Sequence, residues 1–194
     1  MRISSFDRKT LETDITCKIN IDGTGKCNCN TGIGFLDHML VLFSKHGSFD
    51  VDLLCKGDLN VDNHHSVEDI GIVLGNAFKT ALDTKTGINR YGTFYCPMDE
   101  SLSRVSIDLS GRGYLVYNVN ITRDKVGDME TDAMKEFFYA LAMNLGMNLH
   151  ITNLYGENTH HIFESIFKSL SRALKEACSI NEKNQDIPST KGVL

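Results

Sequence analysis

The chain lacks long apolar runs, an excess of positive charge and a second pair of close cysteines. No run is long enough to cross a bilayer, and residues 1–20 lack the apolar segment of a secretory signal, so we predict a cytosolic protein that does not enter a membrane. The net charge of −5 excludes a generally basic nucleic-acid-binding protein. With 41% hydrophobic residues among 194, the chain can still bury a sizeable core.

Of the six cysteines, Cys27 and Cys29 form the one pair that is close in sequence. A zinc site built from cysteines needs a second such pair, which is missing here. Most of the six lie in apolar, strand-like segments. We therefore interpret all of them as reduced thiols that contribute to packing.

One unusual cluster occurs twice, as HHSVE at residues 64–68 and as HHIFE at residues 160–164. In an α-helix, residues four positions apart lie on one face, so His64 and Glu68 can bind one metal ion together. His65 points in another direction and is available to a different ion. Apolar residues follow each cluster at spacings of three and four, which predicts two helices that pack against a core and present ligands from their first turns.

A single cluster of this kind is most often only the polar start of a helix. Two identical copies favour two metal sites, in which each ion takes the His/Glu pair of one helix and the remaining histidine of the other. The two sites would then consist of His64, Glu68 and His161, and of His160, Glu164 and His65. Nitrogen and oxygen ligands without thiolates suit Mn, Fe, Co, Ni or Zn, and the spacing does not choose among these metals.

The elements predicted around the clusters come in the same order twice. The first half is predicted to contain strand 10–21, a returning hairpin strand 26–30, helix 35–46, strand 49–54 and helix 64–82. The second half is predicted to contain strands 91–97, 103–109 and 114–121, helix 131–145, strand 149–151 and a helix that begins at the second cluster. Aligning Glu12 with Glu100 also aligns the glycine turns at 23–25 and 111–113, so we predict an internal duplication with halves 1–90 and 91–180.

Two further histidines break the symmetry of the halves. His38 lies on a very apolar helix, where it is either a satisfied core histidine or an extra ligand for one of the metal sites. The second half has no histidine at the equivalent position, and His150 stands in the following strand instead. The spacing does not decide which site each histidine completes. Glu12 is a lone glutamate ahead of a strand, a place that is usually solvated surface.

The candidate anion-binding residues are basic and lie at turns, on helices or in the tail: Arg90, Arg112, Lys168 and Lys191. The tail, 181–194, is either a disordered polar end or an anion pocket formed by Ser189, Thr190 and Lys191. Six histidines and two glutamates give each of two ions three imidazoles and one carboxylate, which leaves coordination positions open for chemistry. Metals beside basic residues predict a small anionic substrate such as a phosphate ester.

The motifs around these residues closely resemble those of the imidazoleglycerol-phosphate dehydratase family of histidine biosynthesis. The resemblance covers almost the whole chain and is carried by ET at 12–13, GFLDHML at 34–40, DNHHSVED at 62–69, RYG at 90–92, PMDE at 97–100, GENTHH at 156–161, FK at 167–168 and PSTKG at 188–192. It implies that an enzyme with two Mn(II) ions per active site removes water from D-erythro-imidazole-glycerol phosphate to give imidazole-acetol phosphate.

The resemblance also implies ligand sets, a fold and an assembly. One ion is expected at His38, His65, His160 and Glu164, and the other at His64, Glu68, His150 and His161. The implied fold is α+β and ribosomal protein S5 domain 2-like: each half is a four-stranded sheet with two helices on one face, and the helices are packed between the two sheets. The implied assembly is a homo-oligomer, a 24-mer built from trimers, with active sites completed between subunits.

The same resemblance implies roles for the polar residues. The expected substrate-binding residues are Glu12, His38, His46, His64, Glu68, Arg90, Arg112, His160, Lys168, Ser189, Thr190 and Lys191. Of these, Arg90, Arg112, Ser189 and Lys191 are expected to contact the phosphate, with Lys168 nearby. The expected catalytic carboxylates are Glu12, Glu68 and Glu164. Because the C–H proton to be removed is barely acidic, the imidazole ring of the substrate, held between two metal ions, must accept the electrons. We hypothesise that Glu12 carries the acid/base work.

Two alternatives come from other classes of protein. A dinuclear hydrolase would use the same ligands to attack simple phosphate esters with water. A metal-storage or metal-binding protein would need the ligands but would have no use for Arg90, Arg112 or Lys191.

Overall fold

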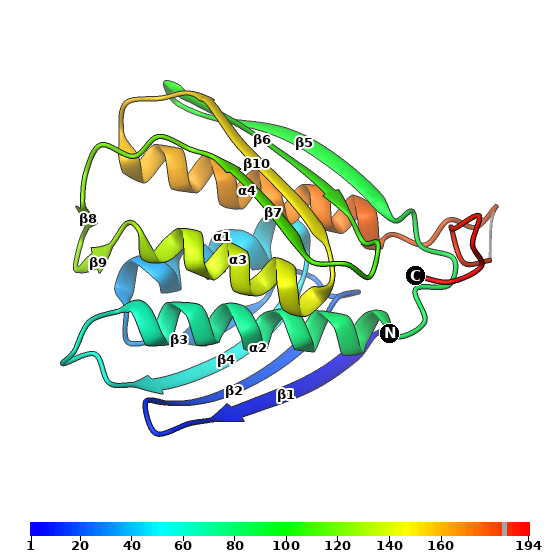
Figure 1. Cartoon of the computed structure of the whole chain (residues 1–194), viewed down its shortest axis with the longest axis horizontal. Helices are drawn as coiled ribbons and strands as arrows, with labels where there is room; N and C mark the ends of the chain where they lie inside the picture. Colours follow the sequence, from blue (N-terminus) through cyan, green and yellow to red (C-terminus); the bar gives the residue numbers. More distant parts are fainter. Residues whose placement is uncertain (184–185) are drawn as a thin grey trace.

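The computed structural model describes residues 1–183 and 186–194 and has two four-stranded sheets with four helices between them (Figure 1). The first half contains β1 (Ile3–Lys9), β2 (Thr13–Asn20), β3 (Cys27–Asn30), α1 (Gly34–Gly47), β4 (Asp50–Gly57) and α2 (His64–Leu82). The second half contains β5 (Tyr91–Met98), β6 (Ser101–Asp108), β7 (Tyr114–Asn118), α3 (Ala133–Leu145), β10 (Asn148–Tyr155) and α4 (Thr159–Cys178). A short hairpin of β8 (Lys125–Val126) and β9 (Met129–Glu130) precedes α3. The α+β duplication is confirmed.

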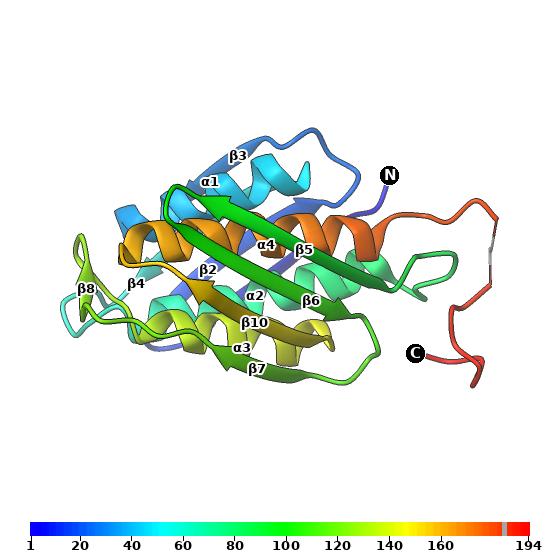
Figure 2. The ribbon, with the colours of Figure 1, turned by 90° about the horizontal axis from the view of Figure 1, so that it is seen from above.

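The core lies between the sheets because each sheet turns one face of alternating apolar residues inward. In β2, for example, Ile15, Cys17 and Ile19 are buried while the residues between them are more exposed. Helix α2 covers β1 and β2, and α4 covers β5 and β6. The helices also pack across the two halves, since α1 contacts α4 and α2 contacts α3. Figure 2 shows the second sheet lying over α4 and α3.

The strand order is β1-β2-β4-β3 in the first sheet and β5-β6-β10-β7 in the second. The predicted hairpin between strands 10–21 and 26–30 is therefore wrong, because β3 pairs in parallel with β4. Asp50 at the start of β4 explains this difference, since its Oδ1 accepts the backbone N–H groups of Thr24 at 2.8 Å and Lys26 at 3.0 Å. These bonds hold the loop after β2 against β4. Likewise, β7 pairs in parallel with β10 instead of returning beside β6.

The sequence does not predict β1, because its alternation is weak: Ile3 is exposed and Ser4 is the one buried residue of the strand. It pairs antiparallel with β2 along its whole length.

Among the described residues, none of the helices combines the length and the apolar character needed to cross a bilayer.

Candidate metal and substrate site

The two His-His-x-x-Glu clusters begin α2 and α4, as predicted. Asn158 caps α4 by accepting the backbone N–H of His160 at 3.0 Å. At α2, Oδ1 of Asp62 accepts the backbone N–H of His64 at 2.8 Å. These bonds satisfy N–H groups that a helix start leaves without intrahelical partners, and they fix where the side chains of the first turn point.

A three-residue cluster joins α1 to α4 and contains His38, His160 and Glu164. The Nε2 atoms of both histidines lie 3.1 Å from Oε1 of Glu164, and the ligand atoms of the three residues lie within 4.8 Å of one another. Ligand atoms bound to one first-row metal ion stand roughly 3–4 Å apart, because each bond is about 2.1 Å long. Two imidazole nitrogens and a carboxylate oxygen at this spacing fit such an ion.

Glu164 is ionised despite being only 8% exposed. Burial by itself raises the pKa of this carboxyl group, but hydrogen bonds from Lys168 and His38 outweigh burial and lower the pKa to about 2. The Lys168 Nζ atom donates to Oε2 at 2.6 Å. The cluster therefore presents a fixed negative charge on Oε1, where a cation would bind.

The second histidine of each pair is oriented by a carboxylate. Nδ1 of His161 lies 2.7 Å from Oε2 of Glu100, and Nδ1 of His65 lies 3.0 Å from Oδ2 of Asp58. Because a carboxylate only accepts, both rings carry a proton on Nδ1, and each hydrogen bond raises the pKa of its histidine. When such a ring is otherwise neutral, its Nε2 atom is left as the possible ligand.

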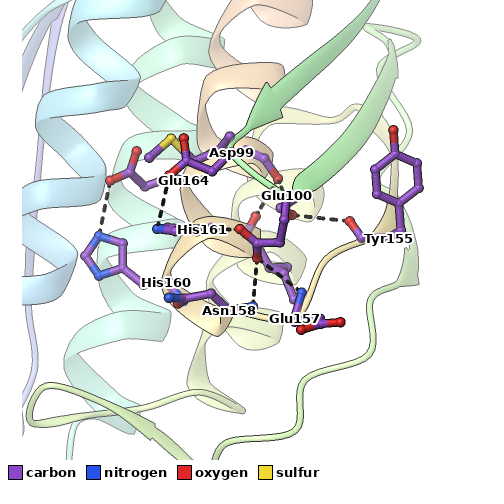
Figure 3. A network of polar contacts seen from close by, with 12 residues as sticks. Asp99, Glu100, Tyr155, Glu157, Asn158, His160, His161 and Glu164 are labelled. Atoms are coloured by element: carbon purple, nitrogen blue, oxygen red, sulfur yellow. Dashed lines mark hydrogen bonds and ion pairs between the residues drawn. The ribbon is translucent and has the colours of Figure 1, made fainter.

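Figure 3 shows that the adjacent imidazoles of His160 and His161 point to different acids, as the helical spacing predicts. His160 faces Glu164, whereas His161 faces Glu100 and Asp99, whose Oδ2 lies 3.8 Å from Nε2 of His161. The Oε1 atom of Glu100 also accepts the backbone N–H groups of the loop before α4, at Glu157 and Asn158. The hydrogen bond from His161, with the backbone bonds, lowers the pKa of Glu100 to about 2.

Replacing the carboxylate that orients His161 should weaken metal binding. We expect Glu100→Gln to lower the affinity for Mn(II) about 10- to 100-fold, because the ring loses its charged hydrogen-bond acceptor. Titration of metal-free protein with Mn(II) measures this change. Glu157→Gln is the matched control, since that exposed residue contributes only its backbone N–H to the contact. Equal affinity in the two variants would show that Glu100 does not orient a ligand.

One chain does not bring the other expected ligands together. Nε2 of His64 lies 3.6 Å from Oε2 of Glu68 on α2, and both side chains are more than two-fifths exposed. His150 is exposed on β10, opposite Ser106 of β6. His65 lies beside Asp58 and Glu12. In the described part of the chain, His38, His160 and Glu164 are the one group of three metal-ligand side chains this close together.

Arg90 and the tail form an open pocket at the other end of the molecule. The pocket is lined by Arg90, Tyr91, residues 186–190 and Gly192. The Arg90 guanidinium donates to both oxygens of Asp108, at 2.7 and 3.1 Å, and to the carbonyl oxygen of Pro188 at 2.9 Å. The hydrogen bond to Asp108 raises the pKa of Arg90, which keeps this positive charge in place.

The remaining candidate residues lie in three places. Lys168 contacts the cluster through Glu164, and Arg112 and Lys191 are exposed on the turn after β6 and in the tail. His46 lines a groove with Lys45 and Arg172. Burial lowers the pKa of His46, and the nearby cations of Lys168 and Arg172 lower it further.

The pocket at Arg90 is far from the cluster of the same chain. The backbone N–H of Arg90 donates to the carbonyl oxygen of Ala177 in the last turn of α4, whereas His160 lies in the first turn. A helix rises 1.5 Å per residue, so the two places are about 25 Å apart. Figures 1 and 2 show the starts of α2 and α4 at one end of the molecule and the C-terminal tail at the other.

Sequence reasoning missed Glu100, Asp99 and Asp58 as partners of the second histidines. For Glu100 a signal existed, because the duplication aligns it with Glu12, and Glu12 lies 3.8 Å from His65 as an equivalent acid. For Asp58 there is no such signal, since it belongs to the loop between β4 and α2.

The chain is thus an α+β protein of two duplicated halves with carboxylate–imidazole clusters at the starts of two helices. The sequence profile described as imidazoleglycerol-phosphate dehydratase matches residues 31–174. The chain belongs to this family.

Relatives and solved structures agree with this assignment. The imidazoleglycerol-phosphate dehydratases of Clostridium kluyveri and Caldanaerobacter subterraneus subsp. tengcongensis are 56% and 55% identical over 194 residues, with both chains covered in full. The crystal structure of this enzyme from Staphylococcus aureus has a TM-score of 0.84 and 40% identity, covering 92% of this chain and 99% of its own. That from Pyrococcus furiosus, in complex with (S)-C348, has a TM-score of 0.84 and 39% identity, covering 97% and 99%.

Proposed function

We propose that this protein uses two Mn(II) ions per active site to carry out the reaction of its family, which removes water from imidazole-glycerol phosphate to give imidazole-acetol phosphate. The observation that carries the proposal is the cluster of His38, His160 and Glu164, whose ligand atoms lie within 4.8 Å of one another around an ionised carboxylate. The repeated His64 and Glu68 pair on α2 offers the matching half of a second site. Family membership supplies the reaction and the substrate.

Nitrogen and oxygen donors without thiolate fit a borderline divalent cation, and Mn(II) is the metal that the family resemblance implies. The first ion would be held by His38, His65, His160 and Glu164, and the second by His64, Glu68, His150 and His161. When bound, the metals would supply Lewis-acid charge that lets the imidazole ring of the substrate accept electrons. The protein orients the rings of His161 and His65 through Glu100 and Asp58, and Lys168 keeps Glu164 ionised by donating to it.

Glu12 is the proposed acid and base. Its side chain is 54% exposed, and Oε1 lies 3.8 Å from Nε2 of His65, so the carboxylate stands beside a proposed ligand and can still reach a substrate. It would take the proton from the middle carbon of the glycerol chain and give a proton to the hydroxyl group that leaves the carbon next to the ring. The resulting enol becomes the ketone product. Glu68 and Glu164 take part as charged ligands.

The phosphate would bind to Arg90, Arg112, Ser189, Thr190 and Lys191, with Lys168 beside the metal cluster and His46 in the groove with Arg172. A separation of about 25 Å between the Arg90 pocket and His160 in one chain is too long for this small substrate to bridge. We therefore propose that each active site joins the metal cluster of one subunit to the phosphate pocket of another. We expect the assembly to be a cytoplasmic 24-mer that is built from trimers.

Metal removal tests the proposed function. Purified protein is analysed for bound metal and assayed with imidazole-glycerol phosphate before and after chelation. We expect turnover to disappear when the metal is removed and to return when Mn(II) is added. We also expect light scattering to show a smaller particle after chelation, because the metal ligands are proposed to come from adjoining subunits. Full turnover without metal would reject the metal-dependent mechanism, and an unchanged particle size would reject metal-linked assembly.

The same experiment, run with simple phosphate esters as a second substrate, distinguishes a dehydratase from a dinuclear hydrolase. Release of phosphate from simple phosphate esters at a comparable rate would favour hydrolysis over dehydration. The dehydratase is expected to leave such esters intact.

A further inference from the structure

The turn that carries Glu12 is held by its own side chains. The Oγ1 atom of Thr10 accepts the backbone N–H of Glu12 at 3.0 Å and that of Thr13 at 2.9 Å. The backbone N–H of Thr10 donates to the carbonyl oxygen of Thr13 at 2.8 Å. The backbone of Glu12 is thus fixed, although its carboxylate is exposed.

Asp69 ties this turn to α2. Oδ2 of Asp69 accepts the hydroxyl proton of Thr13 at 2.5 Å, and Oδ1 accepts from Nε of Arg8 at 3.0 Å. Asp69 is 7% exposed and Thr13 is 2% exposed, so the first of these bonds is shielded from water. Asp69 follows Glu68 directly on α2, and charge-assisted bonds of this kind are short and directional. The network therefore sets the position of Glu12 relative to the helix that carries His64, His65 and Glu68.

The second half has the same positions but a different network. The duplication places Ser101 and Ser165 where the first half has Thr13 and Asp69. Their hydroxyl oxygens are 3.5 Å apart, and Ser165 is bonded more closely to Ser103, at 2.6 Å. That turn is held to its helix through its glutamate itself, since Glu100 is engaged by His161 on α4 and by two backbone N–H groups.

We infer that Asp69, acting through Thr13 and braced by Arg8, is the positioning residue for Glu12. The duplicated glutamates have separate tasks: Glu100 orients a histidine, whereas Glu12 is left exposed and is held in place through its backbone. In the first half the turn is tied to its helix through Asp69 and Thr13, which leaves the carboxylate of Glu12 available to a substrate. The inference rests on the acid/base role proposed above for Glu12.

Thr13→Val and Thr13→Ser form a matched pair that tests the link. Valine keeps the size of threonine but removes the hydroxyl group, whereas serine keeps it. We expect Thr13→Val to lower kcat about 10- to 100-fold, as expected for a small displacement of a catalytic group, while KM and bound metal stay unchanged. Thr13→Ser should retain most of the activity. Asp69→Asn, which cannot accept both bonds, should behave like Thr13→Val if it folds.

A double-mutant cycle separates positioning of Glu12 from a general loss of structure. In a Glu12→Gln background, Thr13→Val should not lower kcat further, because there is no acid/base group left to misplace. An equal further loss, or an unchanged kcat in Thr13→Val alone, would overturn the inference. Ser101→Ala is the control from the second half, and its effect should be independent of Glu12.

The acid/base role of Glu12 and the positioning role of Asp69 can be tested separately. If Glu12→Gln itself turns over normally, the acid/base role fails and the positioning role of Asp69 fails with it. If Glu12→Gln is impaired but Thr13→Val is not, only the positioning role is rejected.

Discussion

Glu12→Gln is expected to lower kcat by about 10²- to 10⁴-fold, the range that general acid–base catalysis contributes. The amide has the shape of the carboxylate but cannot exchange a proton with the substrate. The side chain is 54% exposed, so the substitution leaves no buried group without a partner. Steady-state kinetics with metal analysis should therefore show a lower kcat with KM and Mn(II) content near those of the unsubstituted protein.

The duplication supplies a control for this result. The same change at the aligned position, Glu100→Gln, is expected to act through metal affinity, so that saturating Mn(II) restores much of its activity. Excess Mn(II) should not restore Glu12→Gln. Normal turnover by Glu12→Gln would assign the acid/base role to another group.

A mixture of two inactive variants should recover activity if each site is shared between subunits. His38 belongs to the cluster on α1 and α4, whereas His65 lies beside Asp58, outside that cluster in the same chain. His38→Ala and His65→Ala are each expected to lose activity about 10³-fold, because several kcal/mol of metal charge stabilisation is lost. When both variants are produced together, about one quarter of the sites should receive both intact histidines if the chains mix at random.

The matched control pairs two variants of one cluster. His38→Ala with His160→Ala should recover nothing, because every cluster in the mixed assembly then lacks one of its own ligands. Activity assays of tagged, co-purified mixtures distinguish the two cases. No recovery from His38→Ala with His65→Ala would mean that one chain supplies both histidines.

The sequence predicts much of this fold because its strongest patterns are local. Periodic apolar residues locate α1 to α4, and alternation locates the central strands. The pairing of β3 and β7 does not follow from such patterns, since it depends on contacts far along the chain, such as those that Asp50 makes with Thr24 and Lys26. The conformation of the loop that holds Asp58 against His65 cannot be predicted from periodic patterns either.

The site is predicted in part for the same reason. Helical spacing separates the direction of His160 from that of His161, and the structure has this separation. The joining of His38 to Glu164 depends on how α1 packs against α4, which spacing leaves open. The completion of both ligand sets by neighbouring subunits stays a prediction.

The packing of helices across the two halves bears on how such a chain could arise. Each half buries its first helix against the last helix of the other, so half of the chain alone would expose two apolar helix faces to water. A single-repeat ancestor could therefore have been stable only as a symmetric pair of identical polypeptides. Fusion into one gene then freed the two copies from that symmetry, and Glu12 and Glu100 could diverge within one molecule.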